Sequence, residues 1–456
     1  MDKPSTTQDD GIILDSFGQQ ILPIYTQICF CFSVDDAQSY PRVIETLETA
    51  LEKVQEQFPW LAGRVVDEGA TSCRTGVFKI KSLGEAPRLA VKDLRDDSSF
   101  PSMEALRLAK FPITALNEDI VAPRKTSISA GDLAGPEVFL VQATIINGGL
   151  ILTFLGQHQA MDGIGQDHII RLFSKACRHE AFTDEELSIC NLTTTSATIP
   201  QLDPSHDVPP TVSTYQIVDP NNQSTFGQNS APCSWAYFSF NKTSLETLKS
   251  TASQTCPPTT FISTDDALSA FIWKSITLAR LPRLNPATPS TFARAVDVRA
   301  LLSLPVLHPG FVQNMAYNTL TISDLLSMPL GVLAASLRSK IDPQTSTLAH
   351  DTRALATLLA TSEDRRSVSF AALLKRTSDV FFSSWVKMGC YGYDFGQGLG
   401  RAEAVRRSRS HVTEGLAYLM PKTREGEVGL VVCLSEEDML ALRGDREFGR
   451  YAEYVG

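Results

Sequence analysis

The residues best suited to chemistry are His158 and Asp162, four positions apart in the stretch GQHQAMDG at positions 156–163. An imidazole with an ordinary pKa of about 6.5 can accept a hydroxyl proton at neutral pH and return it to a leaving group. The spacing therefore predicts an acid–base site centred on His158. The chain contains no G-x-S-x-G nucleophile elbow, so a serine acyl-enzyme is not indicated.

The segments beside His158 predict how it is held. Residues 138–146 and 150–155 are rich in β-forming residues and are joined by Asn-Gly-Gly, which predicts a hairpin. Residues 164–177 carry apolar residues at helical spacing. His158 is thus expected in a loop between a buried strand and a helix, where a rigid scaffold can direct a catalytic side chain.

The residues alone leave another interpretation of His158 open, since a neutral histidine can simply be satisfied inside a core. A zinc site is disfavoured, because the chain has no H-E-x-x-H and one His with one Asp does not make a four-ligand site. No metal is expected.

Length and charge restrict the class of protein. The chain has 456 residues, too many for one core, and two domains are expected. A net charge of −10 disfavours nucleic acid as the partner. No apolar run approaches the roughly 18 residues of a membrane span. Nine cysteines without a C-x-x-C suit free thiols in a reducing compartment, so a cytoplasmic protein is expected. We further expect a monomer that binds neither nucleic acid nor membrane.

Strand and helix patterns mix along the whole chain, which predicts a mixed α/β (α+β) class. Residues 1–10 are polar and are expected to be a disordered tail. Six prolines within residues 196–232 exclude a continuous helix or central strand there. That segment is the expected crossover between an N-terminal domain (11–195) and a C-terminal domain (233–456).

Other stretches give clear element predictions. Residues 23–34 and 235–240 indicate strands, and Pro41 opens an amphipathic helix that ends before Pro59. Ser263 followed by acidic residues is typical of a capped helix start, here predicting a helix over 264–280. Strands are predicted at 291–299, 312–322 and 428–434, with helices across 324–340 and 350–361. Between 85 and 136 the pattern is weak.

The H-x-x-x-D-G segment resembles that of the coenzyme A-dependent acyltransferases called the BAHD family. The second signature of that family, D-F-G-W-G, is represented by DFGQG at positions 394–398, with Gln397 in place of Trp. FPWLAGRV from Phe58, AVDVR at 295–299 and Ser-Ser-Trp at 383–385 are further similarities, and they fall in the family's order. The resemblance is greatest to the fungal branch that acetylates trichothecenes, through NGGLILTFLGQHQAMDGIGQD, STDDALSAFIWKS and the terminal YAEYVG.

The resemblance implies two similar domains, each a mixed sheet flanked by helices, in a chloramphenicol-acetyltransferase-like arrangement. A channel at their interface would admit acetyl-coenzyme A from one face and a small hydrophobic, trichothecene-like alcohol from the other. The implied reaction transfers an acetyl group to the C-3 hydroxyl of a trichothecene, and no cofactor is bound permanently. A relative acylating another terpenoid or alkaloid alcohol, or a catalytically silent binding protein, remains the alternative.

The resemblance also implies residue roles. His158 would be the general base, while Asp162 would pair with Arg299 of the other domain and support the site structurally. Ser383 and Trp385 would stabilise the oxyanion, since an indole N–H only donates; Trp385 as a plain core aromatic is equally open. Residues of the second signature would form a structural loop near the channel: Asp394, Gly396 and Gly398.

The phosphates of coenzyme A need hydrogen-bond donors. The capped helix start at Ser263 and Thr264 offers free amides and the positive end of a helix dipole. The other candidates are a hydroxyl and four cations, and cations of this kind are more often solvated surface residues: Ser384, Lys249, Arg401, Arg406 and Arg407.

Overall fold

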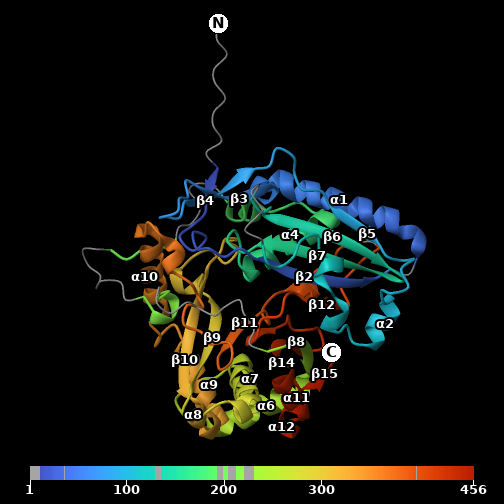
Figure 1. Cartoon of the computed structure of the whole chain (residues 1–456). Helices are drawn as coiled ribbons and strands as arrows, with labels where there is room; N and C mark the ends of the chain where they lie inside the picture. The colour runs from blue at the N-terminus through green and yellow to red at the C-terminus, as the bar shows by residue number, and fades with distance from the viewer. Residues whose placement is uncertain are drawn as a thin grey trace.

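The computed structural model describes residues 11–34, 36–128, 135–192, 199–203, 212–219, 231–396 and 398–456. The predicted tail (1–10), most of the predicted crossover (196–232) and Gln397 lie outside these residues. The chain forms two layered halves, one above the other in Figure 1, and each is built on its own large sheet.

The first half contains a five-stranded sheet in the order β12-β2-β7-β6-β5. Its neighbours are antiparallel except for the parallel pair β5 and β6. Its strands are β2 (Tyr25–Ser33), β5 (Ala90–Asp93), β6 (Phe139–Ile146), β7 (Gly149–Gln157) and β12 (Ala404–Arg406). A small three-stranded sheet adds β1 (Ile12–Ile13), β4 (Val77–Ser82) and β3 (Gly63–Glu68).

Alternation along the strands divides the residues between the two faces of the first sheet. On β2, Ile28, Phe30 and Phe32 belong to one core with the helices α1 (Tyr40–Gln57) and α4 (Gly163–Cys177). Cys29 and Cys31 point to the other face and pack with α2 (Met103–Leu108). The sheet is therefore buried on both sides.

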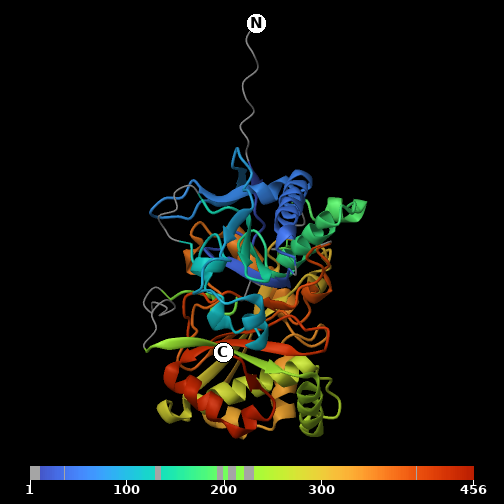
Figure 2. The same cartoon turned by 90° about the vertical axis from the view of Figure 1, so that its right-hand side faces the viewer.

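The second half contains a seven-stranded mixed sheet in the order β10-β9-β11-β13-β14-β8-β15. Its strands are β8 (Cys233–Phe240), β9 (Pro289–Asp297), β10 (Gln313–Thr321), β11 (Val380–Ser384), β13 (Leu416–Leu419), β14 (Val428–Ser435) and β15 (Glu453–Tyr454). Figures 1 and 2 show helices on the side of this sheet that faces away from the first half. These helices are α6 (Lys242–Thr255), α7 (Thr264–Arg280), α8 (Ile322–Ser327), α9 (Leu330–Ser339), α11 (Glu436–Gly444) and α12 (Arg446–Gly449).

Alternation on β8 explains how the two halves adhere. Ala236, Phe238 and Phe240 share a core with the outer helices, whereas Trp235 and Tyr237 belong to the core of the first half. Burying both faces of a β-strand requires an almost continuously apolar sequence, which WAYFSF supplies. The first half thus packs against the inner face of the second sheet.

Most predicted elements are present within a few residues, including the hairpin of β6 and β7, α4, the capped α7 and the strands β2, β8, β9, β10 and β14. The weakly patterned region before 136 contains β5, α2 and α3 (Glu118–Val121), and the remaining helices are α5 (Asp184–Ile189) and α10 (Leu348–Thr361). Strand β12 was not predicted, because three residues show no period. It joins the first sheet although it follows position 233, so the C-terminal part of the chain contributes one strand to the first half.

Within the described residues no helix is long and apolar enough to cross a membrane. All nine cysteines are free thiols, and six of them are buried.

Phe395 of the second signature gives a test of the core. Its ring is 1% exposed and lies 5.1–6.4 Å, centroid to centroid, from the rings of Phe30, Phe32, Phe154 and Phe173. Replacing Phe395 by Ala should lower the free energy of unfolding by about 3–5 kcal/mol, because a cavity remains among these rings. Urea denaturation measures this, and a loss below about 1 kcal/mol would contradict the packing. The control Leu440→Ala, at a position 66% exposed, should change stability by less than about 0.5 kcal/mol.

Candidate active site

His158 follows the last residue of β7, and its backbone is fixed by the first half. Its N–H donates to the carbonyl of Ile24 at 2.9 Å. The side-chain amide of Gln159 donates to the carbonyls of Gly18 (3.2 Å) and Gln20 (2.6 Å). The strand-to-helix corner is therefore held on one side by the chain that leads into β2.

The ring of His158 has a defined tautomer. Nδ1 lies 3.0 Å from the carbonyl oxygen of Met161, which can only accept, so Nδ1 carries the proton. Nε2 is then left with a free lone pair on a side chain that is partly exposed. Phe311, from the second half, contacts the ring nearly edge-on at 5.1 Å between centroids. This arrangement can accept a proton at Nε2.

Burial lowers the pKa of His158 below its ordinary value. The hydrogen bond to Met161 and the negative charge of Asp162 oppose this shift, and the positive charge of Arg407 reinforces it. The imidazole is accordingly neutral at pH 7, the state that a general base requires.

The carboxylate of Asp162 is fully engaged away from the imidazole. It caps α4 by accepting from the N–H of Gly165 at 2.8 Å, and it accepts from the N–H of Val312 at 2.8 Å. Arg299 donates to both of its oxygens, at 2.9 and 3.0 Å. Burial raises the pKa of Asp162, but Arg299 and these hydrogen bonds outweigh burial and hold it below the usual value.

Arg299 uses its whole guanidinium at the junction of the halves. Besides Asp162, it donates to the carbonyls of His308 (2.9 Å) and Gly310 (2.7 Å) and to the carboxylate of Asp297 (2.9 Å). The five N–H groups of an arginine are thereby satisfied on a side chain that is only 1% exposed. The predicted pairing of Asp162 with Arg299 thus joins the start of α4 to the segment between β9 and β10.

The two halves approach closely at this junction. A Cβ atom added to Gly165 would lie 1.9 Å from the carbonyl oxygen of Pro309. Only glycine permits that approach, so the first turn of α4 lies directly against the loop that carries the acceptors of Arg299.

Ser383 and Trp385 lie on the inner side of the second sheet. Ser383 pairs with Tyr418 of β13, while its neighbour Ser384 points outward and donates to Asp265 at 2.6 Å. A Cβ atom at Gly163 would lie 3.5 Å from the indole nitrogen of Trp385. That N–H has no acceptor among the described residues, so it remains available to a ligand.

The second signature and the segment before it pack along helix α4 and do not lie beside His158. Asp167 on α4 accepts from the N–H of Gly389 (3.1 Å) and the hydroxyl of Tyr393 (2.8 Å). Gly396 approaches the carbonyl of Cys177 at the end of the helix. The fifteen-residue α4 is about 22 Å long, so this loop lies roughly that far from Asp162.

The loop itself is shaped by glycine. Gly396 and Gly398 have φ angles of +81° and +97°, a region that other residues rarely adopt. Asp394 accepts from the N–H of Gly396 at 2.9 Å, and its backbone forms an isolated antiparallel β-bridge with that of Arg401. The geometry of all three predicted motif residues is that of a turn, and Gln397 is not among the described residues.

Four of the candidate coenzyme A residues gather at the start of α7. Ser263 caps the helix reciprocally with Asp266, and Ser384 binds Asp265 in the same turn. Thr264 is the first helical residue and is exposed. Lys249 lies beside them, with its ammonium bound to the carbonyl of Ile262.

A cationic cluster borders this helix start, and sequence reasoning had found only one of its members. Lys249 and Arg338 both stack on Phe261, at 5.2 and 5.3 Å from the ring centroid. Phe261 is 66% exposed, which is unusual for a large apolar ring. No local pattern indicates Arg338, because helix α9 brings this residue to the cluster from a distant part of the chain.

The other proposed cations lie elsewhere. Arg401 is exposed beside Gly392. Arg406 is buried and donates to the carbonyls of Phe111, Lys110 and Val405, so it is a structural residue and cannot reach a phosphate. Arg407 lies near His158, on the inner side of the second sheet.

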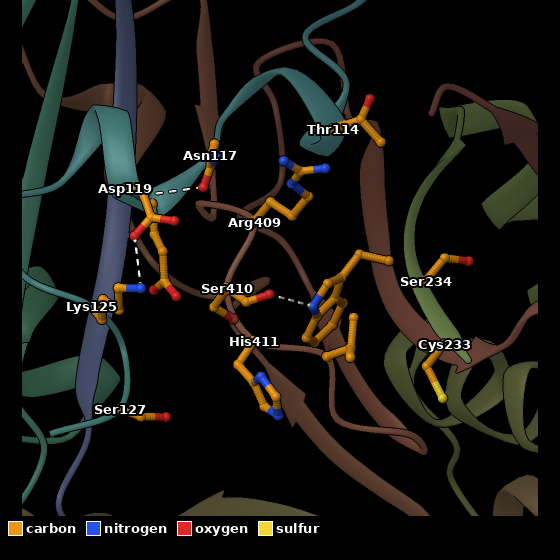
Figure 3. A pocket seen from close by; sticks show the side chains of 13 residues that line it. Thr114, Asn117, Asp119, Lys125, Ser127, Cys233, Ser234, Arg409, Ser410 and His411 are labelled. Carbon is orange, nitrogen blue, oxygen red and sulfur yellow. Dashed lines mark hydrogen bonds and ion pairs between the residues drawn. The ribbon is translucent and has the colours of Figure 1, made fainter. Parts of the chain in front are cut away.

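A pocket of about 770 Å³ opens between segments of both halves (Figure 3). Its wall includes Trp235, whose indole N–H donates to the carbonyl of Ser410 at 3.1 Å, and the ion pair of Asp119 with Lys125 at 3.0 Å. Its volume lies in the range of small-molecule sites. It shares no lining residue with the cluster at the start of α7. The described residues hold no group of three or more side chains fit for a metal ion.

Comparison with known proteins gives the family. The domain described as trichothecene 3-O-acetyltransferase-like, N-terminal, matches residues 24–177, and the family described as Transferase matches residues 120–448. An O-acetyltransferase of Cryptosporiopsis sp. is 46% identical, with 97% of each chain covered. The trichothecene 3-O-acetyltransferase of Fusarium sporotrichioides is 45% identical, with 99% of each covered.

Solved structures agree with this result. A structure of the F. sporotrichioides enzyme with coenzyme A and T-2 has a TM-score of 0.90 at 45% identity, with 98% of this chain and 99% of that chain covered. The F. graminearum counterpart with coenzyme A and deoxynivalenol has a TM-score of 0.93 at 42% identity, with 98% and 100% covered. Vinorine synthase, 15% identical with a TM-score of 0.66, shares the fold over 99% of this chain and 96% of its own.

Fold and sequence together define a two-domain acyltransferase of mixed α/β architecture. More particularly, the chain belongs to the Transferase family, the BAHD-type enzymes that the two signatures resemble, and it is an O-acetyltransferase of the trichothecene 3-O-acetyltransferase-like kind.

The ion pair of Asp162 and Arg299 should be needed for stability. Replacing Arg299 by Met leaves a buried carboxylate unpaired and should lower the free energy of unfolding by about 3–5 kcal/mol. The exposed pair of Arg95 with Asp93 provides the control, since Arg95→Met should cost no more than about 1 kcal/mol. If urea denaturation shows the same loss of unfolding free energy for both substitutions, the buried pair does not stabilise the protein more than an exposed pair does.

The same pair predicts a pH dependence. Because folding lowers the pKa of Asp162, its contribution is complete above the unfolded value of about 3.9 and is lost as the pH falls through the folded value. The stability difference between the wild type and Arg299→Met should therefore shrink below pH 4.

Proposed function

We propose that this enzyme transfers the acetyl group of acetyl-coenzyme A to the C-3 hydroxyl of a trichothecene sesquiterpenoid. The observation that carries the reaction type is the orientation of His158, whose Nδ1–H is fixed on Met161 and whose Nε2 is free. The acceptor class rests on full-length similarity to enzymes named for that alcohol. Masking the hydroxyl of a toxin would protect the organism that makes or meets it.

In the proposed mechanism, Nε2 of His158 takes the proton of the alcohol as its oxygen attacks the thioester carbonyl. A tetrahedral intermediate forms with a negative charge on the former carbonyl oxygen, and the indole N–H of Trp385 donates to that oxygen. The carbon–sulfur bond then breaks, and the imidazolium returns the proton to the departing thiolate. No acyl-enzyme is needed, because the thioester is already activated.

Asp162 has a supporting role in this scheme. Its four hydrogen bonds fix the first turn of α4 and hence the loop of Met161, which orients the imidazole. It is a positioning residue, because both of its oxygens are occupied by the backbone and by Arg299.

The two ligand regions suit two substrates. Phosphates of coenzyme A would meet Lys249 and Arg338 beside the free amides at the start of α7, with Phe261 offering a face for stacking. The pocket walled by Trp235 would admit the alcohol. His158 does not line this pocket, but Trp235 packs on Tyr418, whose ring contacts Trp385 of the proposed oxyanion site. A different terpenoid or alkaloid alcohol is the second candidate acceptor, since a relative 46% identical is an O-acetyltransferase whose name specifies no alcohol.

His158 provides the first test of this function. With acetyl-coenzyme A and a trichothecene bearing a free C-3 hydroxyl, His158→Ala should lose about 10²–10⁴-fold in kcat/KM, the usual contribution of a general base. His350→Ala, on the exposed surface of α10, should keep full activity. Unchanged turnover in His158→Ala would exclude the general base; turnover only with another alcohol would exclude the acceptor.

The pH profile follows from the same residue. Since burial lowers the pKa of His158, kcat/KM should be constant at neutral pH and should fall only below about pH 6.5, as the imidazole becomes protonated. An acid limb centred above pH 7 would contradict a neutral base whose pKa is lowered.

The donor site can be tested separately. Replacing Lys249 and Arg338 together by Ala should raise KM for acetyl-coenzyme A about tenfold or more and leave KM for the alcohol and kcat nearly unchanged. The matched control removes two surface cations far from the start of α7, Lys110 and Arg450, and should leave KM for acetyl-coenzyme A as it was. An unchanged KM in the first variant would place the phosphates elsewhere.

A further inference from the structure

Arg407 is a buried cation without a counterion. It directly follows β12, and the residue is only 5% exposed. It makes no hydrogen bond or ion pair with the part of the chain that the structure describes, whereas its neighbour Arg406 is fully engaged. Buried charges in proteins are ordinarily paired, so an unpaired arginine requires an explanation.

Two aromatic rings hold the guanidinium in place. Its central carbon lies 4.0 Å from the ring centroid of Tyr418 and 5.2 Å from that of Trp385. Cation–π contacts of this kind orient an arginine without consuming its N–H donors. The nitrogens of Arg407 are not among the sealed polar atoms that lack a partner, so they retain access to solvent.

The location is the reacting centre. Trp385 approaches Gly163, the residue that follows Asp162, and Tyr418 packs at 6.4 Å on Trp235 of the pocket wall. Arg407 is also close enough to His158 to disfavour its protonated form. The groups that interact with this position are the imidazole of His158, the thiol of Cys29 and the rings of Tyr418 and Trp385. The charge of Asp162 is already neutralised by Arg299.

We propose that Arg407 is a catalytic residue that binds the thioester carbonyl oxygen and stabilises the oxyanion formed when the alcohol attacks. The inference rests on the proposed function. In the step concerned, the alcohol oxygen bonds to the carbonyl carbon and its proton passes to Nε2 of His158. The carbonyl π electrons move to oxygen, opposite the guanidinium, and return when the carbon–sulfur bond breaks and the thiolate takes the proton.

Such an arrangement favours the transition state over the ground state. A neutral thioester gives a buried guanidinium little compensation, whereas the oxyanion gives it a full partner inside a site of low dielectric. The same charge helps to keep His158 neutral before reaction.

Replacing Arg407 by Met tests the proposal. Met retains the apolar stem against Tyr418 and Trp385 but removes the charge. We expect kcat to fall about 10²–10³-fold with KM values changed less than threefold, and Arg407→Lys to recover part of kcat. The melting temperature should be unchanged or raised, because no ion pair is lost. The control is Arg443→Met, which removes an arginine stacked at 3.8 Å on Tyr454 on the outer surface and should leave kcat intact.

A second measurement does not depend on the acceptor. The pKa of His158, followed by NMR of the imidazole, should rise in Arg407→Met because a nearby positive charge has gone. A lowered melting temperature with an unshifted His158 pKa would overturn the proposal and leave Arg407 structural. If the wild type acetylates some other alcohol, the proposed acceptor fails, but the loss of kcat in Arg407→Met is measured with that alcohol and still decides the role of the residue.

Discussion

The structure depends on one buried ion pair, between Asp162 and Arg299. Each half contributes one member, and neither charge could be buried without the other, because the desolvation of an unpaired ion costs several kcal/mol. The pair is supported by the carbonyls of His308 and Gly310, so its geometry is determined by backbone from the second half. Because these hydrogen bonds form only over a narrow range of distances, they restrict how the two halves can be placed relative to each other.

Helix α4 connects this ion pair to the catalytic histidine. Its first turn is capped by Asp162, and the residue before the cap orients the ring of His158. Along its length the segment from Trp385 to Gly396 is attached at Asp167 and at the end of the helix. The two signatures are more than two hundred positions apart in sequence, but they lie at opposite ends of the same helix, α4. We therefore expect a change in the glycine turn to act on catalysis through α4.

Local pattern was sufficient to predict the hairpin, α4 and the place of His158, because these depend on periodicity within about twenty residues. The pairing of Asp162 with Arg299 came from family resemblance, since no local signal joins residues 137 positions apart. Strand β12 was missed because it is short. Arg338 and the true setting of Arg407 were inaccessible for a related reason: both are placed by tertiary packing, and a cation in sequence looks the same whether it is solvated or buried.

The electrostatics of the site are asymmetric in a way that suits its reaction. Asp162 is matched by Arg299, but Arg407 is matched by nothing among the described residues, so the centre carries an excess positive potential near His158. The guanidinium keeps access to solvent but has no counterion among the described residues, and a fold selected for stability alone does not need a cation there. A site that must stabilise a transient negative charge has the opposite requirement. The unpaired charge is therefore best understood as preorganisation for the tetrahedral intermediate, held by the packing of β12 on β2.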